Sequence, residues 1–284
     1  VTAPCCQYDE RAWERLHFLL EQARIANLRV VLRVGYAWSY HPLAGDTSER
    51  VHALMNQPQA RAAHLRFVQR LARETADKPQ VALTFMTWED QWLRRIDDSA
   101  RGDFQQFAAT RQDAAPFLAG QPSLPTPTGD HAALFNAYWD WLVIEKIYTP
   151  SAAELPSLSY EARIDKEPNY VVGPDGTRHI DRWLGHEGML RQRPGRPVTI
   201  YWAPFWGARN EGEKLPAERS LALLQALLTE VRGNTAGQPL YIDQFNGVDN
   251  TLGYERNAVI ARDQIPAFLD GAAGHYAARR EALA

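Results

Sequence analysis

Glu89 occupies a position in the sequence where a carboxyl group could do acid–base chemistry. It follows residues 81–87, VALTFMT, an apolar run that predicts a buried β-strand. Strict alternation along that strand would place Leu83, Phe85 and Glu89 on one side, among aromatic groups that favour a protonated carboxyl. Such a group could protonate the leaving oxygen of a glycosidic bond. The alternative is an exposed glutamate in an acidic turn with Asp90.

Aromatic and hydrogen-bonding residues follow several predicted strands and could bind a sugar. The chain has nine tryptophans, and an indole can stack on the apolar face of a sugar ring while its N–H serves a hydroxyl. The candidate substrate-binding residues are Arg33, Tyr36, Trp38, Trp88, Asp165, Tyr201, Trp202, Trp206 and Asn246. Two alternatives stay open: the tryptophans could fill core gaps, and Arg33 could form a buried ion pair with Asp165 or Glu161.

The elements that would position these residues alternate between helical and strand-like periods. Apolar residues recur at helical spacing in 9–25, 61–75, 131–147, 180–190 and 218–231, and Asn27 is a plausible stop for the first helix. Apolar, β-branched runs predict strands at 28–34, 81–87, 158–164, 198–202 and 240–245. Because a helix precedes each strand, we expect a parallel sheet with helices outside it.

The alternation predicts an α/β fold, a (β/α)8 TIM barrel that occupies residues 1–284 as a single catalytic domain. Five convincing strands fall short of the eight that closure requires, so we expect this chain to lack the first strands and the last strand. The rhythm also breaks at about residues 90–130, a polar stretch with a possible helix at 103–112. This insertion is either a lid or cleft wall, or a loosely ordered surface segment.

Three segments resemble the clan A glycoside hydrolases, the cellulase-like group that includes family 39 and exopolysaccharide-cluster glycosidases. Residues 30–38 (VVLRVGYAW) are similar to the third strand of that clan, 85–89 (FMTWE) to the fourth, and 239–246 (PLYIDQFN) to the seventh. The resemblance implies a TIM barrel with Glu89 as the catalytic acid/base and a nucleophile at position 244. It also implies a periplasmic or secreted protein, although the sequence leaves the compartment open.

Two residues depart from the pattern of the clan. Trp88 stands where the clan usually has asparagine, and Gln244 stands where the catalytic glutamate would be. An amide cannot attack an anomeric carbon as a carboxylate does. Either Gln244 is an engineered change, another carboxylate serves, or the protein binds glycan without cleaving it. Asp243 and Asp165 are the candidates for the other carboxylate, with Glu161 and Asp249 near other strand ends, and each could instead be a structural hydrogen-bonding group.

The composition argues against several other functions. With 31 basic and 34 acidic residues the net charge is −3, which provides no strong field for nucleic acid or anionic lipid. The two adjacent cysteines, Cys5 and Cys6, cannot form a disulfide framework. Metal-ligand spacing, nucleotide-binding glycine motifs and apolar runs long enough to span a membrane are missing from the sequence. We therefore expect no metal, no cofactor and no membrane span.

These observations lead to one leading hypothesis and two alternatives. The leading hypothesis is a hydrolase that cleaves O-glycosidic bonds within an oligo- or polysaccharide, with retention expected if a second carboxylate lies roughly 5 Å from Glu89. A catalytically inactive glycan-binding barrel would account for Gln244, and a transglycosylase would use the same acid. The sugar, the linkage and the oligomeric state are not predicted.

Overall fold

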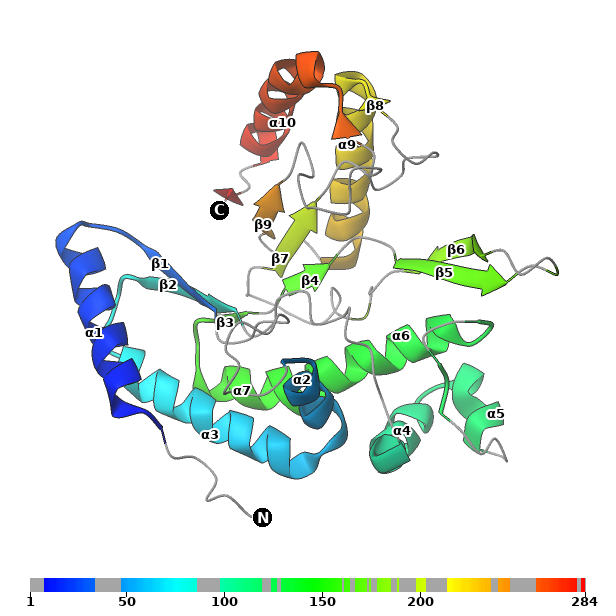
Figure 1. Cartoon of the computed structure of the whole chain (residues 1–284), viewed down its shortest axis with the longest axis horizontal. Helices are drawn as coiled ribbons and strands as arrows, with labels where there is room; N and C mark the ends of the chain where they lie inside the picture. The colour runs from blue at the N-terminus through cyan, green and yellow to red at the C-terminus, as the bar shows by residue number, and fades with distance from the viewer. Residues whose placement is uncertain are drawn as a thin grey trace. The chain divides into compact units, whose positions relative to one another are not determined.

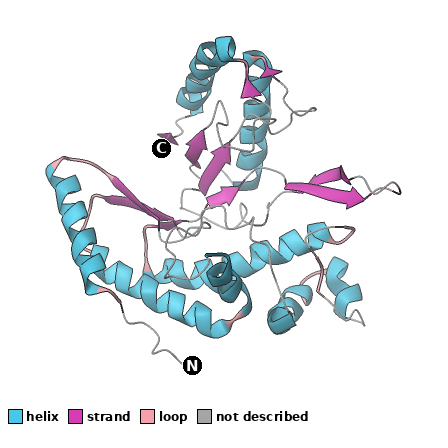
Figure 2. Cartoon of the chain, viewed as in Figure 1, coloured by secondary structure: helices cyan, strands magenta, loops and turns pink. Residues whose placement is uncertain are grey.

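The structure is a computed structural model, and it divides the chain into two compact units, Val1–Tyr160 and Glu161–Ala284. It describes residues 8–33, 47–85, 98–118, 124–126, 129–159, 161–163, 167–172, 174, 178–184, 188, 198–202, 214–235, 240–245, 259–279 and 282–283. Figure 1 traces the chain and Figure 2 shows its helices and strands.

Unit 1 contains a small parallel sheet and a larger set of helices. Its elements are α1 (Glu10–Ile25), β1 (Val30–Arg33), α2 (Thr47–Asn56), α3 (Pro58–Thr75), β2 (Val81–Phe85), η3 (Asp98–Ala100), α4 (Arg101–Ala108), η4 (Gln112–Ala114), α5 (Ala115–Leu118), α6 (Ala132–Trp141), the π-helix η5 (Leu142–Tyr148), α7 (Thr149–Glu154) and β3 (Leu158–Ser159). The helices α6, η5 and α7 follow one another without a break, which confirms the helix predicted at 131–147 and extends it to Glu154.

Helix α1 begins and ends at local capping signals. The side chain of Asp9 accepts a hydrogen bond from the Arg11 backbone N–H, at 3.0 Å. At the other end Asn27 adopts a left-handed φ of 54°, and its N–H donates to the Arg24 carbonyl, while the Leu28 N–H donates to the Ala23 carbonyl. This pair of bonds is a Schellman motif, in which asparagine is tolerated at the left-handed position. The predicted stop at Asn27 is confirmed.

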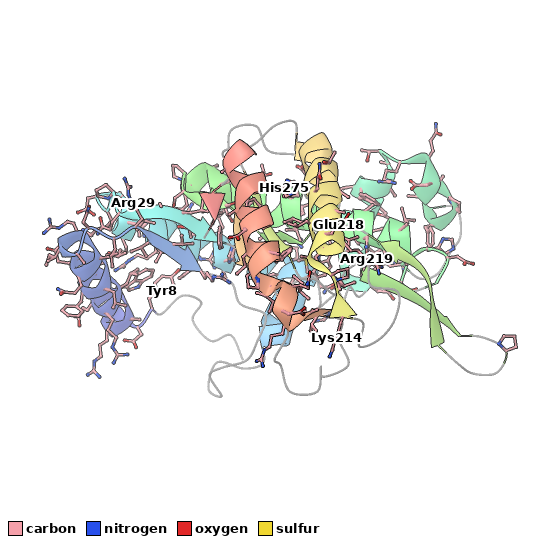
Figure 3. All side chains as sticks on the ribbon, turned by 90° about the horizontal axis from the view of Figure 1, so that it is seen from above. Tyr8, Arg29, Lys214, Glu218, Arg219 and His275 are labelled. Atoms are coloured by element: carbon pink, nitrogen blue, oxygen red, sulfur yellow. The ribbon has the colours of Figure 1, made fainter. Side chains whose placement is uncertain are left out.

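Helix α1 packs on α3 through aromatic side chains. The Trp13 ring stacks on the Phe67 ring at a centroid distance of 6.0 Å, and the Tyr8 ring meets Trp13 edge-on, also at 6.0 Å. The Arg70 guanidinium lies 5.4 Å from the centroid of the Trp13 ring. Figure 3 labels Tyr8 before α1 and Arg29 after it. These aromatic contacts therefore hold α1, the helix that leads into β1, against α3.

The sheet of unit 1 has the order β1-β2-β3, with both pairs parallel. Its central strand is buried: Leu83 is 7% exposed, and Thr84 and Phe85 are fully buried. The register pairs Arg33 with Phe85 and Phe85 with Ser159, so all three strands end at the same edge. The Tyr148 hydroxyl donates to the Leu158 carbonyl at 2.8 Å and ties β3 to the π-helix.

Unit 2 contains a second parallel sheet, a parallel pair and an antiparallel hairpin. Its elements are β4 (Glu161–Arg163), β5 (Glu167–Val172), β6 (Arg178–Leu184), β7 (Val198–Trp202), β8 (Lys214–Leu215), α9 (Ala217–Thr235), β9 (Leu240–Phe245), β10 (Val259–Ile260), η6 (Arg262–Gln264), α10 (Ile265–Arg279) and β11 (Ala282–Leu283). The four-stranded sheet has the order β11-β9-β7-β4, β10 pairs with β8, and β5 pairs with β6.

Helices α9 and α10 lie side by side in unit 2 (Figure 1). Gly271 of α10 permits the close approach, because a Cβ added there would come within 2.4 Å of Leu221 Cδ1. Phe268 and Leu224 are fully buried. Figure 3 labels His275 on α10, Glu218 and Arg219 in the first turn of α9, and Lys214 on the preceding strand β8.

The predicted TIM barrel is wrong. The strands in the described part of the chain form parallel sheets of three and four strands and two separate pairs, and no closed eight-stranded sheet is among them. Four of the five predicted strands are present as single strands, and the one predicted at 158–164 is divided into β3 and β4, which belong to different sheets. Pairing within the two larger sheets is parallel, as expected. Helix–strand alternation predicts parallel neighbours, but closure depends on non-local pairing that it does not specify.

The helix predicted at 180–190 is also wrong, because residues 178–184 form the strand β6. Its apolar residues Ile180, Trp183 and Leu184 happen to have helical spacing. The strand forms by antiparallel pairing with β5, from Glu167↔Leu184 to Val172↔Arg178. Between the two strands the sequence reads GPDG, a combination that favours a turn between strands.

Candidate functional site

The strand ends of unit 1 place Arg33 at the sheet edge that precedes Glu89. Arg33 and Phe85 are register partners at the C-terminal ends of β1 and β2. The Arg33 guanidinium carbon lies 5.7 Å from the centroid of the Phe85 ring, within the range of a cation–π contact. Glu89 follows Phe85 by four residues and lies outside the described residues. Ligands of open parallel sheets bind beyond the carboxyl ends of the strands, which is this edge.

The central strand beneath this edge is held by hydrogen bonds. The Thr84 N–H donates to the Ser157 carbonyl at 2.9 Å, and the two side-chain hydroxyls lie 3.1 Å apart. Thr84 is fully buried. The segment that leaves Phe85 toward Glu89 therefore starts from a fixed strand.

Unit 2 brings two of the candidate residues into register at a second strand edge. Tyr201 of β7 pairs with Gln244 of β9 on one side and with Arg163 of β4 on the other. Trp202 pairs with Phe245, which is the last residue of β9. These strands are parallel, so their carboxyl ends also share one edge.

The pairing of β7 with β9 shifts its register beside Asp243. Ile200 pairs with Ile242 and Tyr201 pairs with Gln244, so the ladder passes over Asp243. The expectation that Asp243 and Gln244 point to opposite faces assumes an unbroken alternation. The register shift breaks the regular pairing on which that expectation rests.

Seven of the candidate residues fall outside the part of the chain that the structure describes. These are Tyr36, Trp38, Trp88, Glu89, Asp165, Trp206 and Asn246. Arg33, Tyr201, Trp202, Asp243 and Gln244 lie within it, each at or near the C-terminal end of a strand.

Within the expected insertion at 90–130, the described residues 98–118 form ordered helices that pack on α6. Phe104 and Phe107 of α4 are 2% and 3% exposed, and their rings lie 5.0 and 5.3 Å from the buried Tyr138 ring. The Tyr138 hydroxyl donates to the Ala100 carbonyl, and burial raises the pKa of Tyr138. Residues 98–118 are therefore helical, with Phe104 and Phe107 buried against α6.

A charged cluster, here called the Asp103 cluster, joins α4 to α3 and to the π-helix. Asp103 Oδ2 lies 2.7 Å from Arg61 Nη2, and Asp103 Oδ1 lies 3.3 Å from Lys146 Nζ. The Arg61 guanidinium also donates to the Leu54 and Met55 carbonyls of α2, at 3.2 and 3.0 Å. The Arg61 and Asp103 side chains are only 11% and 15% exposed. No spacing rule in the sequence linked these positions, which are 42 residues apart.

Two further polar groups, the half-buried His64 and the buried Gln80, were not among the sequence candidates. Burial lowers the pKa of His64 on α3 to about 4. Gln80, which immediately precedes β2, is 6% exposed and lines a pocket with Arg29. A lone histidine on a helix and a glutamine before a strand have no motif that would have marked them.

The described residues contain no group of three or more histidine, cysteine, aspartate or glutamate side chains that could hold a metal ion. Within the same part of the chain, the helices are too short or too polar to cross a membrane.

Comparisons with protein-family models, with curated proteins and with solved structures found no match for this chain.

Proposed function

We propose that this protein is a glycoside hydrolase that cleaves O-glycosidic bonds within an oligo- or polysaccharide, with Glu89 as its general acid/base. The observation that carries the proposal is the edge at which β1 and β2 end together, because Glu89 follows that edge by four residues and Arg33 lies on it. The proposal does not need a closed barrel. It needs only the rule that parallel sheets bind ligands beyond the carboxyl ends of their strands.

The chemistry assigned to Glu89 is proton donation to the leaving oxygen, followed by activation of water. The resemblance of residues 85–89 to the acid/base strand of clan A glycosidases supports this role. Arg33, on the neighbouring strand, offers guanidinium N–H groups to sugar hydroxyls at the same edge. With a second carboxylate roughly 5 Å from Glu89 the reaction would retain configuration, and with a wider gap it would invert it.

The test is the Glu89→Gln variant, assayed for release of reducing sugar from soluble β-glucan and from bacterial exopolysaccharide. We expect the rate to fall about a hundred- to ten-thousandfold, the usual contribution of a general acid. The rate of hydrolysis of an aryl glycoside with a good leaving group should fall less, because the aryl group leaves without being protonated. Glu14→Gln, on the exposed face of α1, is the matched control and should keep the parent's rate. Equal rates for Glu89→Gln and the parent would refute the proposal.

A second candidate function is glycan binding without hydrolysis, and Gln244 is the observation that favours it. Gln244 is the register partner of Tyr201 at a strand edge, where the resemblance implies a catalytic carboxylate. In this case the parent would bind glycan but release no sugar. Hydrolysis by the parent well above background would exclude it.

The Gln244→Glu variant separates the two functions further. It should gain hydrolysis if position 244 is the nucleophile position that the resemblance implies, because the substitution restores the missing carboxylate. If Asp243 is the working carboxylate, Asp243→Asn should abolish the parent's hydrolysis. Product analysis distinguishes hydrolysis from transglycosylation, which would transfer the sugar to a second sugar instead of to water.

A further inference from the structure

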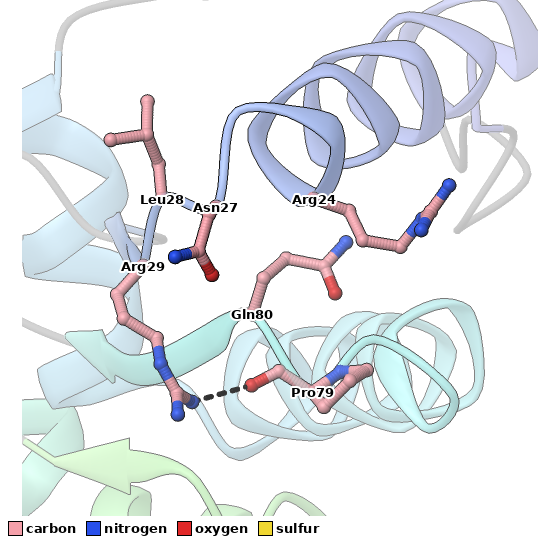
Figure 4. A pocket seen from close by; sticks show the side chains of 6 residues that line it. All are labelled: Arg24, Asn27, Leu28, Arg29, Pro79 and Gln80. Atoms are coloured by element: carbon pink, nitrogen blue, oxygen red, sulfur yellow. Dashed lines mark hydrogen bonds between the residues drawn. The ribbon is translucent and has the colours of Figure 1, made fainter.

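An apolar stripe is exposed on α1 and on the turn that follows it. The structure describes five large apolar side chains that are exposed, and four of them lie here. These are Phe18, Leu19, Ile25 and Leu28, which are between 60% and 64% exposed and are called the α1 stripe. In Figure 4 the Leu28 side chain points away from Pro79 and Gln80. Apolar residues exposed singly are normal, whereas a group of them on one element marks an interaction surface.

The helical part of the α1 stripe is complementary to itself. Phe18 and Ile25 are seven residues apart, so they lie two turns apart on one side of the helix, opposite the buried Trp13 and Leu20. The midpoint between Phe18 and Ile25 falls between residues 21 and 22. A two-fold axis through that midpoint, perpendicular to the helix, places Phe18 opposite Ile25 of a second, antiparallel copy. The same axis places Ile25 opposite Phe18 of that copy.

The charges around the α1 stripe also fit a second copy. Glu21 lies beside the axis, where it would meet its own copy, but it accepts hydrogen bonds from Arg24 Nε and Nη2 at 2.8 and 2.6 Å and is thereby neutralised. Arg15 is exposed near the N-terminal end of the stripe, and an antiparallel copy places it near the C-terminal end of the other helix, where a cation is favoured. Because the exposed Glu14 and Arg15 both border the stripe, a partner with charges of both signs fits it better than anionic lipid does.

We propose that the α1 stripe is the contact through which two copies of this chain form an antiparallel dimer with two-fold symmetry. Phe18 packs on Ile25 of the second copy, and Leu19 and Leu28 border this contact. So few side chains make an interface below the standard size of about 1,200–2,000 Å², so we expect a dissociation constant of about 10–100 μM. None of these residues belongs to the proposed glycosidase site, so the dimer does not depend on the proposed function.

The first experiment is sedimentation velocity of the whole chain at about 1–300 μM. We expect a monomer–dimer equilibrium in the parent. The double variant Phe18→Ser, Ile25→Ser should weaken it at least about tenfold, because it removes the apolar contacts on both sides of the axis. Both side chains are exposed, so the fold should persist, and far-UV circular dichroism checks this. Leu269→Ser is the matched control, since Leu269 is the fifth exposed apolar side chain, 47% exposed on α10, and this variant should dimerise as the parent does.

The second experiment tests the antiparallel arrangement by disulfide cross-linking in a Cys5→Ser, Cys6→Ser background. Gln22→Cys lies beside the axis, so mild oxidation should link two copies. Arg11→Cys lies about 16 Å along the helix from the axis, so it should not link them. A parallel pair would instead link through both positions, because each residue would then face its own copy.

Four results would overturn the proposal. The parent could stay monomeric over the whole concentration range, or the double variant Phe18→Ser, Ile25→Ser could associate like the parent. Leu269→Ser could weaken association as much as that double variant does, or Arg11→Cys could cross-link as readily as Gln22→Cys. A monomeric parent that binds vesicles of phosphatidylcholine and phosphatidylserine would assign the stripe to a membrane surface instead. These measurements need no catalytic activity, so they are independent of the Glu89 experiment.

Discussion

Asp103 is the common partner of two cations in a largely buried cluster, and its charge can be removed by the Asp103→Asn substitution. The asparagine keeps one oxygen that can accept from Arg61 or Lys146, but the negative charge is gone. The Arg61 guanidinium, 11% exposed, would then be held only by neutral acceptors. Breaking a buried pair by removing one partner costs about 3–5 kcal/mol.

The expected loss is smaller than that range, because both side chains keep some solvent and the amide oxygen still accepts a hydrogen bond. Asp103 also lies in the first turn of α4, where a carboxylate adds about 0.3–1 kcal/mol through the helix dipole. We therefore expect Asp103→Asn to lower the free energy of unfolding by about 2–3 kcal/mol. The measurement is urea unfolding, with the m-value checked for constancy.

Asp113→Asn is the matched control. Asp113 forms a two-bond pair with Arg111, but its side chain is 54% exposed, so the loss should be at most about 1 kcal/mol. The double variant Arg61→Met, Asp103→Leu should lose less than the sum of its single variants, because no buried charge is left unpaired. Equal losses for Asp103→Asn and Asp113→Asn would refute the reasoning that burial makes the Asp103 cluster important.

The remaining predictions concern the effect of His64 and of two glycines of α10 on the free energy of unfolding. Burial lowers the pKa of His64 from its ordinary 6.5 to about 4. Between these two pH values the unfolded chain binds a proton at His64 and the folded chain does not. The contribution of His64 to the free energy of unfolding should therefore be complete above about pH 7, and the free energy should fall by about 1.5–3 kcal/mol between about pH 6.5 and 4. Urea unfolding at several pH values measures this dependence, which His64→Leu should reduce and the exposed control His131→Gln should keep. Gly274→Ala should stabilise by about 0.5–1 kcal/mol, because nothing lies within 4 Å of its added Cβ and alanine favours a helix. Gly271→Ala should stabilise less than Gly274→Ala, because its added Cβ would displace the end of the Leu221 side chain, and equal gains in thermal unfolding for the two variants would contradict this.

Local sequence patterns predicted the parts of this protein that depend on local physics. The predicted strands are apolar, β-branched runs in the sequence, and the end of α1 depends on the left-handed conformation that Asn27 tolerates, so neighbouring residues were sufficient evidence. The placement of Arg33, Tyr201 and Gln244 near strand ends followed from the same patterns. The β5–β6 hairpin also had a local signal, the GPDG turn, which the helical spacing of Ile180, Trp183 and Leu184 obscured.

Tertiary structure alone decided which strands share a sheet, where the register shifts beside Asp243, and which distant side chains meet. A hydrophobic period reports that one face of a segment is buried, but it does not say against what. Strand pairing, the Asp103 cluster and the pocket at Gln80 each join residues that are far apart in the chain. The sequence by itself determined the helices α1, α3 and α9 and the strands β1, β2, β7 and β9, with the chemistry available at the strand ends, and non-local packing determined that the strands form separate sheets instead of a barrel.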